Sequence, residues 1–257
     1  MNSPQGTALV TGAAKRVGRA IALDLAANGY DVAVHYGSSA DAAEATVREI
    51  RAIGRSAEAV QADLSQADAT DELVAAAHDA IGPLTLLVNS ASIFEPDRAD
   101  SVTAAGFDRH MAINLRAPMI LSPRFAGQVP DDRDGNVINI IDYRVWKLNP
   151  IYMSYTASKF GLWGITRTMA QALAPRVRVN GIGPGPVLAN VRQDADEFRA
   201  EAAATPLGRG PGLDEIGAAI RFIVATPSMT GQMIALDGGQ HLAWRTPDVI
   251  AGDEQSG

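Results

Sequence analysis

The sequence predicts an α/β fold in which a doubly wound parallel sheet of about seven strands is covered by helices on both faces. One observation predicts the sheet, and a second predicts that the chain forms a single domain. Short apolar segments alternate with amphipathic stretches along almost all of the 257 residues, and strands that alternate with helices in this way pair in parallel. No internal repeat and no low-complexity linker divides the chain. We therefore expect a single domain over residues 1–257.

The first elements along the chain are a strand at residues 7–10, a helix at 17–28, a strand at 31–35 and a helix at 41–53. Further strands are predicted at 57–61, 84–88, 136–141, 177–181 and 233–236, with helices between them. Apolar runs this short are typical of strands that are buried on both faces of a sheet.

Two segments interrupt this alternation. Residues 186–212 are rich in charge and contain Pro186 and Pro211 near their two ends. Because a long insertion in a compact domain is usually functional, we predict a substrate lid there that contains a short helix. Residues 246–257 are predicted to be a polar C-terminal tail.

Composition excludes several classes of protein. With 22 basic and 29 acidic residues the net charge is -7, whereas a protein that binds nucleic acid concentrates Lys and Arg. The absence of cysteine excludes disulfides, thiolate metal sites and cysteine nucleophiles. His35, His78, His110 and His241 do not have the spacing of metal ligands, so we expect no metal. The chain starts without the features of a secretory signal and has no apolar run near the length of a membrane span, so we expect a cytoplasmic protein that does not bind a membrane.

A glycine-rich turn, Thr-Gly-Ala-Ala-Lys-Arg-Val-Gly, follows the first predicted strand. Gly12 permits a tight turn, and Gly18 lets the next helix pack closely, so that the N-terminus of this helix faces an anionic pyrophosphate. A turn of this kind after the first strand is typical of the Rossmann fold. Lys15, Arg16 and Val17 lie between the two glycines and are predicted to line the cofactor site with them.

The second predicted strand ends without a carboxylate, in His35, Tyr36, Gly37, Ser38 and Ser39. An enzyme that uses NAD holds the ribose 2′-hydroxyl with an acidic residue at this place. The serine hydroxyls and the basic pair of the glycine turn would instead bind a 2′-phosphate, so the sequence favours NADP. Alternatively, Ser38 and Ser39 only cap the next helix, and both roles can coexist.

Tyr155 and Lys159 stand at i and i+4 in a segment that reads as a helix. Side chains with this spacing lie on one helix face, and we expect the ammonium group to lower the pKa of the Tyr155 phenol so that it donates a proton near neutral pH. A tyrosine packed on a lysine stem is the structural alternative. The order of the motifs upstream favours catalysis.

These motifs resemble those of the short-chain dehydrogenase/reductase family over about residues 6–242. The glycine turn matches the family pattern TGxxxGxG, except that Arg16 stands at the middle glycine. The resemblance implies further cofactor contacts from Asp63, Leu64, Asn89, Ser90, Ala91, Pro184, Gly185 and Val187. It also implies that Tyr155 and Lys159 are catalytic and contact the cofactor, and that Asn114 holds a water beside the lysine. The alternatives are a helix cap for Asp63 and a structural role for Asn114.

Four features resemble the pteridine reductases within this family. Arg16 replaces the middle glycine, the second and third strands run into His-Tyr and Gln-Ala-Asp-Leu-Ser, Asp142 stands where most members have a catalytic serine, and Ser92 and Phe94 match the segment NASxF. The resemblance implies substrate contacts from Arg16, Ser92, Phe94, Asp142, Tyr152 and Tyr155, with Trp146 as a further candidate. Phe94 is expected to stack on a flat pterin. Asp142 is expected to be catalytic, by binding the amino-bearing edge of the pterin or by relaying a proton with Tyr155.

The alternatives for single residues are a core position for Phe94, a solvated helix position for Arg16 and a loop cap for Asp142. For the whole chain, the resemblance implies an NADPH-dependent reductase of a pterin or dihydrofolate-like substrate, with Tyr155 as the proton donor and a homotetrameric assembly. A carbonyl or 3-oxoacyl-thioester reductase would use the same tyrosine and lysine, but a carboxylate beside a developing oxyanion is electrostatically adverse. A non-catalytic NADP-binding protein would not need the intact catalytic residues.

Overall fold

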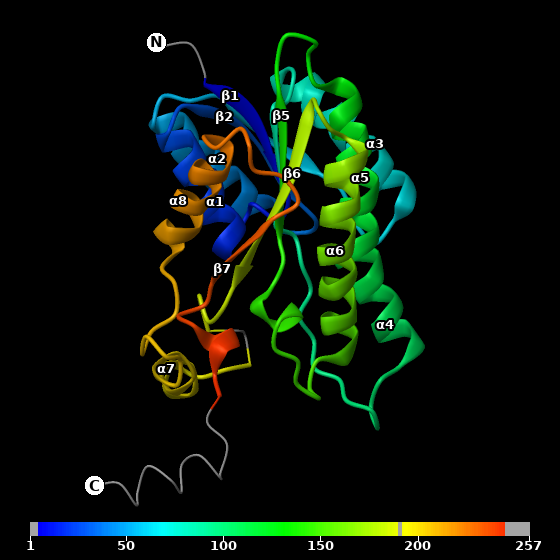
Figure 1. Ribbon diagram of the computed structural model, residues 1–257. Coiled ribbons are helices and arrows are strands. Elements are labelled where there is room, and N and C mark those ends of the chain that lie inside the picture. Colours follow the sequence, from blue (N-terminus) through cyan, green and yellow to red (C-terminus); the bar gives the residue numbers. More distant parts are fainter. Residues whose placement is uncertain (1–4, 190–191, 245–257) are drawn as a thin grey trace, which may run out of the picture.

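The structure, a computed structural model, describes residues 5–189 and 192–244. Within these ranges seven parallel strands form one sheet in the order β3-β2-β1-β4-β5-β6-β7 (Figure 1). The strands are β1 (Gly6–Val10), β2 (Tyr30–Tyr36), β3 (Ala57–Gln61), β4 (Leu86–Asn89), β5 (Gly135–Ile140), β6 (Val177–Pro184) and β7 (Met233–Leu236). The predicted α/β fold with a doubly wound parallel sheet is confirmed.

Helices cover both faces of this sheet (Figure 1). One face carries α1 (Arg16–Ala27), α2 (Ala40–Ala52) and α8 (Leu213–Val224), whose apolar side chains share one core cluster with β1 and β2. The other face carries α3 (Ala67–Ile81), α5 (Ala117–Gln128) and the long helix α6 (Met153–Ala172), which contribute to a second cluster. The sequence pattern explains the packing of α1, in which Ile21, Ala22, Leu25 and Ala26 are buried on a single helix face.

The predicted strand boundaries agree with the structure to within one residue, except at the start of β4 and at the end of β6. The fourth strand begins at Leu86 and not at residue 84, because the Leu84 N–H donates to the side chain of Gln128 in α5 (2.8 Å) and not to a neighbouring strand. The sixth strand continues to Pro184, three residues beyond the prediction, because its last residues pair with β7. Hydrogen-bond partners on neighbouring elements set both boundaries. The apolar pattern of a single strand gives no information about these partners.

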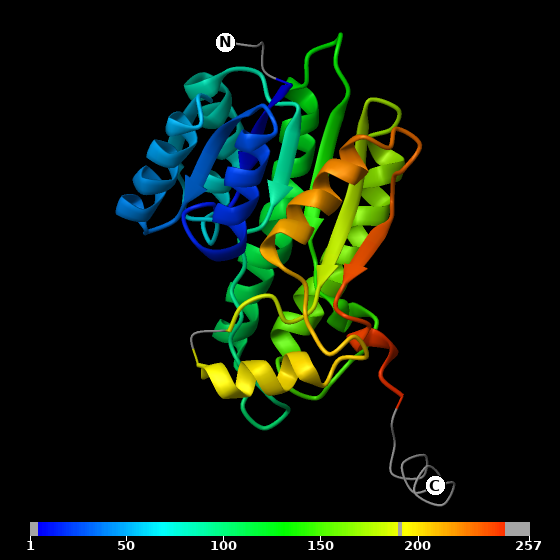
Figure 2. The ribbon, with the colours of Figure 1, turned by 90° about the vertical axis from the view of Figure 1, so that its left-hand side faces the viewer.

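The order of the strands creates a crevice at the carboxyl edge of the sheet. The chain runs from β1 outward to β3 and then returns to place β4 on the other side of β1. Parallel sheets bind ligands outside their carboxyl ends at such a reversal. Helix α7 (Ala195–Ala203) lies at this end of the molecule, apart from the two helical layers (Figure 2). It falls within the predicted lid at 186–212, whereas the predicted tail at 246–257 lies outside the described residues.

Among the residues that the structure describes, no helix is long and apolar enough to cross a membrane. The same residues contain no group of three or more His, Cys, Asp or Glu side chains that could hold a metal ion.

Candidate active site

A cavity of about 1010 Å³ lies at the carboxyl edge of the sheet. Its walls come from the glycine turn after β1, the ends of β2 and β3, the segments after β4 and β5, the start of α6, the segment after β6, and α7. This volume stands at the upper end of the range of pockets that hold one drug-sized ligand. It is large enough for a dinucleotide together with a small second ligand.

The glycine turn lies at the bottom of one half of this cavity. Gly12 has a φ of +66°, and a Cβ added to it would lie 2.9 Å from the Cα of Ala91, so a larger residue would collide with the segment after β4. A Cβ on Gly18 would collide with the carbonyl oxygen of Gly12. Both glycines therefore let backbone segments approach closely at the N-terminal end of α1, where backbone N–H groups favour an anion.

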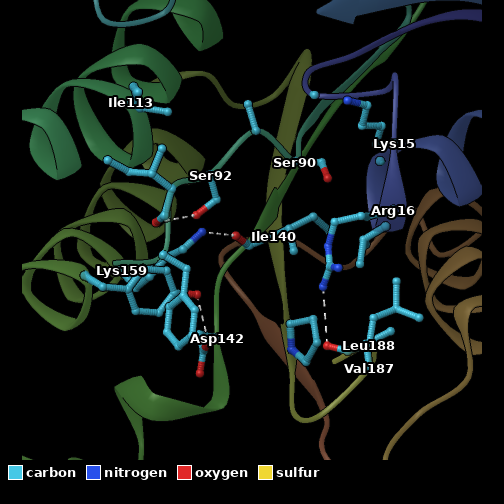
Figure 3. Close-up of a pocket in the computed structure, with 18 of the residues that line it drawn as sticks. Lys15, Arg16, Ser90, Ser92, Ile113, Ile140, Asp142, Lys159, Val187 and Leu188 are labelled. Atoms are coloured by element: carbon cyan, nitrogen blue, oxygen red, sulfur yellow. Dashed lines mark hydrogen bonds between the residues drawn. The ribbon is translucent and has the colours of Figure 1, made fainter. Parts of the chain in front are cut away.

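Arg16 has a positive φ of 54°, a conformation that glycine adopts freely and that costs any other residue free energy. Its guanidinium Nη2 donates to the carbonyl oxygen of Leu188 at 3.3 Å, at the start of the predicted lid (Figure 3). The cavity therefore has a cation at a backbone position that favours glycine. Strain of this kind is kept where the side chain has a function.

The buried ring of His35 holds the glycine turn in place by hydrogen bonds. Its Nδ1 accepts from the Gly12 N–H (3.0 Å), and its Nε2 donates to the carbonyl oxygen of Ala62 (3.1 Å), so the ring joins the segments after β1 and β3. Burial lowers the pKa of His35 to about 4, although the hydrogen bond to Ala62 acts in the opposite direction. The imidazole is therefore neutral near pH 7, and both of its nitrogens are engaged by backbone groups.

The end of β2 carries the residues that were predicted to meet a 2′-phosphate. Ser38 is exposed on the cavity wall. Ser39 occupies the N-cap position of α2, but its side chain makes no capping hydrogen bond, so its hydroxyl does not have the capping role that was the alternative. Asp63 is also exposed on the wall, where hydrogen bonds from Ser65 lower the pKa of its carboxyl group.

The second half of the cavity contains Asp142 and Tyr155. The Tyr155 hydroxyl donates to Oδ2 of Asp142 at 2.8 Å. The tyrosine is 6% exposed and the aspartate 8%. Helix α6 supplies Tyr155, and the segment directly after β5 supplies Asp142.

The electrostatics of Tyr155 differ from the expectation. Burial, followed by the charge of Asp142 and the hydrogen bond to it, raises the pKa of Tyr155 well above its ordinary value. The prediction that Lys159 lowers this pKa is therefore wrong for this arrangement. Lys159 donates from Nζ to the carbonyl oxygen of Ile140 (2.8 Å; Figure 3), and burial lowers its own pKa to about 8 against the attraction of Asp142. The phenol is thus a group that keeps its proton.

Sequence reasoning missed Arg144, which lies two residues after Asp142 and lines the cavity. Its Nη1 lies 3.2 Å from Oδ2 of Asp142, and its backbone N–H donates to Oδ1 at 2.8 Å. Its position in the loop after β5, at the carboxyl edge of a parallel sheet, was the available signal. The segment that was predicted as a lid adds residues that were not predicted individually, namely Leu188, Arg192, Gln193, Glu197, Phe198 and Glu201.

Phe94 and Tyr152 form an aromatic wall of the same half. Their rings are stacked on each other, with centroids 4.1 Å apart and an angle of 16° between the planes. Tyr155 meets Phe94 edge-on at 4.7 Å. Tyr152 has a positive φ of 64° directly before α6, so this tyrosine also holds a strained backbone conformation beside the cavity. The predicted stacking face of Phe94 is thus shared with Tyr152.

The structure places all but two of the predicted site residues on the cavity wall. Those on the wall are Gly12, Lys15, Arg16, Val17, Gly18, His35, Tyr36, Ser38, Ser39, Asp63, Leu64, Ser90, Ala91, Ser92, Phe94, Asp142, Tyr152, Tyr155, Lys159, Pro184, Gly185 and Val187. Asn89 and Asn114 are buried behind it. Trp146, the further candidate, is also outside the lining and packs against the ring of His241 instead (5.2 Å).

Asn114 lies in a π-helical turn at Ala112–Arg116. Its amide nitrogen donates to the carbonyl oxygen of Ile93 (3.0 Å) and to the Ser158 hydroxyl (3.1 Å). Its amide oxygen accepts from the N–H of Ile93 (2.9 Å) and from the Ser92 hydroxyl (3.2 Å). This geometry supports the structural alternative, because the amide fixes the segment that carries Phe94 to α6. Asn89 donates from Nδ2 to the side chain of Asn139 in the next strand (2.8 Å), so its side chain ties β4 to β5.

A family model described as short chain dehydrogenase matches residues 6–200. Among curated proteins, the 3-oxoacyl-[acyl-carrier-protein] reductase of Synechocystis is 34% identical over 238 residues, which cover 90% of this chain and 95% of that protein. The corresponding FabG protein of Staphylococcus epidermidis is 32% identical, with 92% of this chain and 99% of that protein covered.

Among solved structures, FolM alternative dihydrofolate reductase 1 from Brucella canis, complexed with NADP, is 51% identical with a TM-score of 0.92. The match covers 95% of this chain and 97% of that one. The FolM protein of Brucella suis, also in complex with NADP, is 51% identical with a TM-score of 0.91, and 96% and 98% of the chains are covered.

Proposed function

The chain belongs to the short-chain dehydrogenase family, and on this premise we propose that it is an NADPH-dependent oxidoreductase that reduces a pterin or dihydrofolate-like substrate. The FolM structures support this substrate class, because they are 51% identical over nearly the whole chain and are described as alternative dihydrofolate reductases with NADP. The hydride comes from the nicotinamide, and Tyr155 is the proton donor.

The observation that carries the proposal is the contact between Asp142 and Tyr155. A carboxylate at this place repels the oxyanion that develops when a ketone is reduced. The same carboxylate accepts hydrogen bonds from the amino group or ring N–H of a pterin, and it can hold a proton on the way to a ring nitrogen. The carboxylate therefore matches a nitrogen heterocycle better than a simple carbonyl compound.

The residues of the first half of the cavity fit NADPH. The close backbone packing at Gly12 and Gly18 brings the turn against the N-terminus of α1, where backbone N–H groups favour a pyrophosphate. Lys15, Arg16 and the hydroxyls at the end of β2 fit a 2′-phosphate, and β2 ends without the carboxylate that would repel it. When bound, NADPH supplies a hydride at its nicotinamide. Lys159 lies on the wall between the two halves of the cavity, where its ammonium can hold the ribose next to that ring.

The second half of the cavity fits a flat ring. Phe94 and Tyr152 present an aromatic wall, on which a heteroaromatic ligand stacks favourably. Arg16, with its guanidinium donors, and Ser92 also line the cavity. We assign Asp142, Tyr155 and Lys159 to catalysis. We assign the protein to the cytoplasm and to a homotetrameric assembly, as the family resemblance implies.

The test is a panel of dihydropterins, oxidised pterins, dihydrofolate, quinones, ketones and acetoacetyl thioesters, with NADPH oxidation followed by absorbance. We expect turnover of a dihydropterin or dihydrofolate to exceed that of every carbonyl compound in kcat/KM. The curated relatives that are named 3-oxoacyl-[acyl-carrier-protein] reductases make the thioester the decisive competitor. If the acetoacetyl thioester is the better substrate, the proposed substrate class is wrong and the chain is a 3-oxoacyl-thioester reductase.

A further inference from the structure

Arg144 contacts the carboxylate of Asp142 with both its backbone and its side chain. Its backbone N–H donates to Oδ1 (2.8 Å), so that the Asp142 side chain caps the short turn Tyr143–Val145. Its side-chain Nη1 lies 3.2 Å from Oδ2, the oxygen that also accepts from Tyr155. The side chains of Arg144 and Asp142 are only 14% and 11% exposed. The pair is therefore shielded from the water that would screen it at the surface.

Aromatic rings surround the rest of this guanidinium. Its Cζ lies 5.3 Å from the ring centroid of Phe94, 5.0 Å from that of Tyr143 and 5.7 Å from that of Tyr152. Its Nε is buried and has no hydrogen-bond partner among the described residues. Ring faces stabilise a cation, but they do not replace its hydration. A buried cation needs an anion beside it, and Asp142 is the carboxylate in contact with it.

We propose that Arg144 is a positioning residue that pairs with the carboxylate of Asp142 and holds it beside Tyr155, and that this pair makes the site specific for substrates that present N–H donors or a basic ring nitrogen. The inference rests on the proposed function. Without Arg144, the buried carboxylate of Asp142 would lose the cation that pairs with it and would be held less firmly beside Tyr155. A carboxylate that leaves this place would accept less well from a substrate N–H and would repel an oxyanion less, so the preference against carbonyl substrates would weaken.

Other charged or titratable groups act on this pair from the neighbouring elements. Tyr155 and Lys159 face it from α6, Tyr143 adjoins it in the same turn, Glu201 acts on Arg144 from α7, and Asp237 acts on Tyr143 from the segment after β7. Of the two cations, Lys159 donates to the carbonyl oxygen of Ile140, whereas the Arg144 guanidinium contacts the carboxylate directly. Removal of Arg144 therefore takes away the closer of the two positive charges.

The experiment compares Arg144→Gln, which removes the charge, with Arg144→Lys, which keeps it. For each variant, kcat/KM is measured from pH 5 to 9 with a dihydropterin and with an acetoacetyl thioester. We expect Arg144→Gln to lower dihydropterin reduction about tenfold or more near pH 7, the scale of a charge-assisted contact, and to move the acid limb of the profile to higher pH. Arg144→Lys should keep the acid limb of the wild type. Thermal unfolding and NADPH affinity are measured as controls for correct folding. If Arg144→Gln does not fold, the position of the acid limb in Arg144→Lys alone tests the proposal.

A double-mutant cycle with Asp142→Asn separates positioning from a general structural effect. Because the asparagine has no charge to hold, we expect Arg144→Gln to change dihydropterin turnover less than about twofold in this background. Three outcomes would overturn the proposal. The first is a double variant in which the two single effects multiply. The others are an acid limb that Arg144→Gln leaves in place and an acid limb that Arg144→Lys moves as far as Arg144→Gln does.

The thioester assay makes failure of the proposed function distinguishable from failure of this inference. Absence of pterin turnover by the wild type would refute the proposed function alone. The role of Arg144 would then be judged on the thioester, for which we expect Arg144→Gln to raise kcat/KM several-fold below pH 7. An unchanged or lower value there would refute the role of Arg144.

Discussion

Tyr155 donates its phenolic hydrogen to Asp142, with 2.8 Å between the two oxygens, in a site where both residues are buried. The contact raises the pKa of the phenol, after the larger effect of burial itself, so the proton is held and not released to solvent. Proton donation to a substrate therefore requires the substrate to change the surroundings of Tyr155, by taking over its hydrogen bond or by bringing a basic nitrogen next to it.

Replacement of Tyr155 by phenylalanine should remove the proton donor and leave the phosphate contacts intact. We expect kcat with a dihydropterin to fall at least about a hundredfold, the scale of a lost acid-base group. NADPH affinity, measured by fluorescence titration, should change less than about threefold, because the glycine turn lies in the other half of the cavity. A Tyr155→Phe variant with near-normal kcat would show that another group supplies the proton.

Replacement of Asp142 by serine should reverse the substrate preference. We expect dihydropterin reduction to fall at least about a hundredfold, because the acceptor for the substrate N–H is lost. Reduction of the acetoacetyl thioester should be spared or raised, because the repulsion of an oxyanion is relieved. Both are measured as kcat/KM on the purified variant. Unchanged pterin turnover together with lost thioester turnover would assign Asp142 to carbonyl chemistry.

The chain should prefer NADPH to NADH by tenfold or more in kcat/KM, because a charge-assisted contact to a 2′-phosphate contributes about 1.5 to 3 kcal/mol. Lys15 and Arg16 are the cations at the glycine turn, and removal of both should bring the ratio close to one. Steady-state kinetics with the two cofactors measure it. Equal values in the wild type would contradict the assignment of NADP.

The fold was readable from the sequence because its signals are local. Short apolar strands and the amphipathic helices between them determine the layers, and β3 and β7 begin and end where the apolar runs do. Boundaries set by partners on neighbouring strands, as in β4 and β6, were less accurate. The side-chain pattern of one strand does not predict where the neighbouring strand ends.

The site was readable to the extent that single motifs define it. Gly12, Arg16 and Tyr155 stand in segments with recognisable spacing, and all three lie on the cavity wall. Relations between motifs were harder to predict. The i, i+4 spacing indicated that Lys159 controls Tyr155, whereas burial and Asp142 have the larger effects. Arg144 was missed because its importance depends on the burial of its pair with Asp142 and on the ring of Phe94, which comes from a distant segment of the chain.

The positive φ of Arg16 predicts a conflict between stability and cofactor binding. Arg16→Gly and Arg16→Ala both remove the guanidinium, so both should weaken NADPH binding by about tenfold. Only glycine relieves the backbone strain at φ 54°. We therefore expect the glycine variant to be more stable than the alanine variant by about 1 kcal/mol in urea unfolding. Equal stabilities would show that the backbone relaxes when the arginine is removed.

The buried, neutral imidazole of His35 predicts that the folded protein loses stability in mild acid. The folded protein keeps the imidazole neutral down to a pKa of about 4, because burial opposes its charge, whereas the unfolded chain takes up a proton near pH 6.5. The unfolded state therefore binds more protons between these values. The stability that His35 contributes is complete above about pH 6.5 and is lost progressively as the pH falls toward 4.

His35→Gln is the matched control, because an amide can accept from the Gly12 N–H and donate to Ala62 without titrating. The free energy of unfolding of both proteins is measured in urea between pH 7.5 and 5. The difference between the two proteins cancels the effects of the carboxylates that they share. We expect the wild type to lose about 2 kcal/mol relative to His35→Gln by pH 5, since each unit below 6.5 is equivalent to about 1.4 kcal/mol. NADPH affinity of the folded protein should depend on pH to the same extent in both proteins over this range, because the ring of folded wild-type protein stays neutral above its pKa of about 4. A stability difference that does not change with pH would mean that His35 is protonated in the folded protein at the same pH as in the unfolded chain.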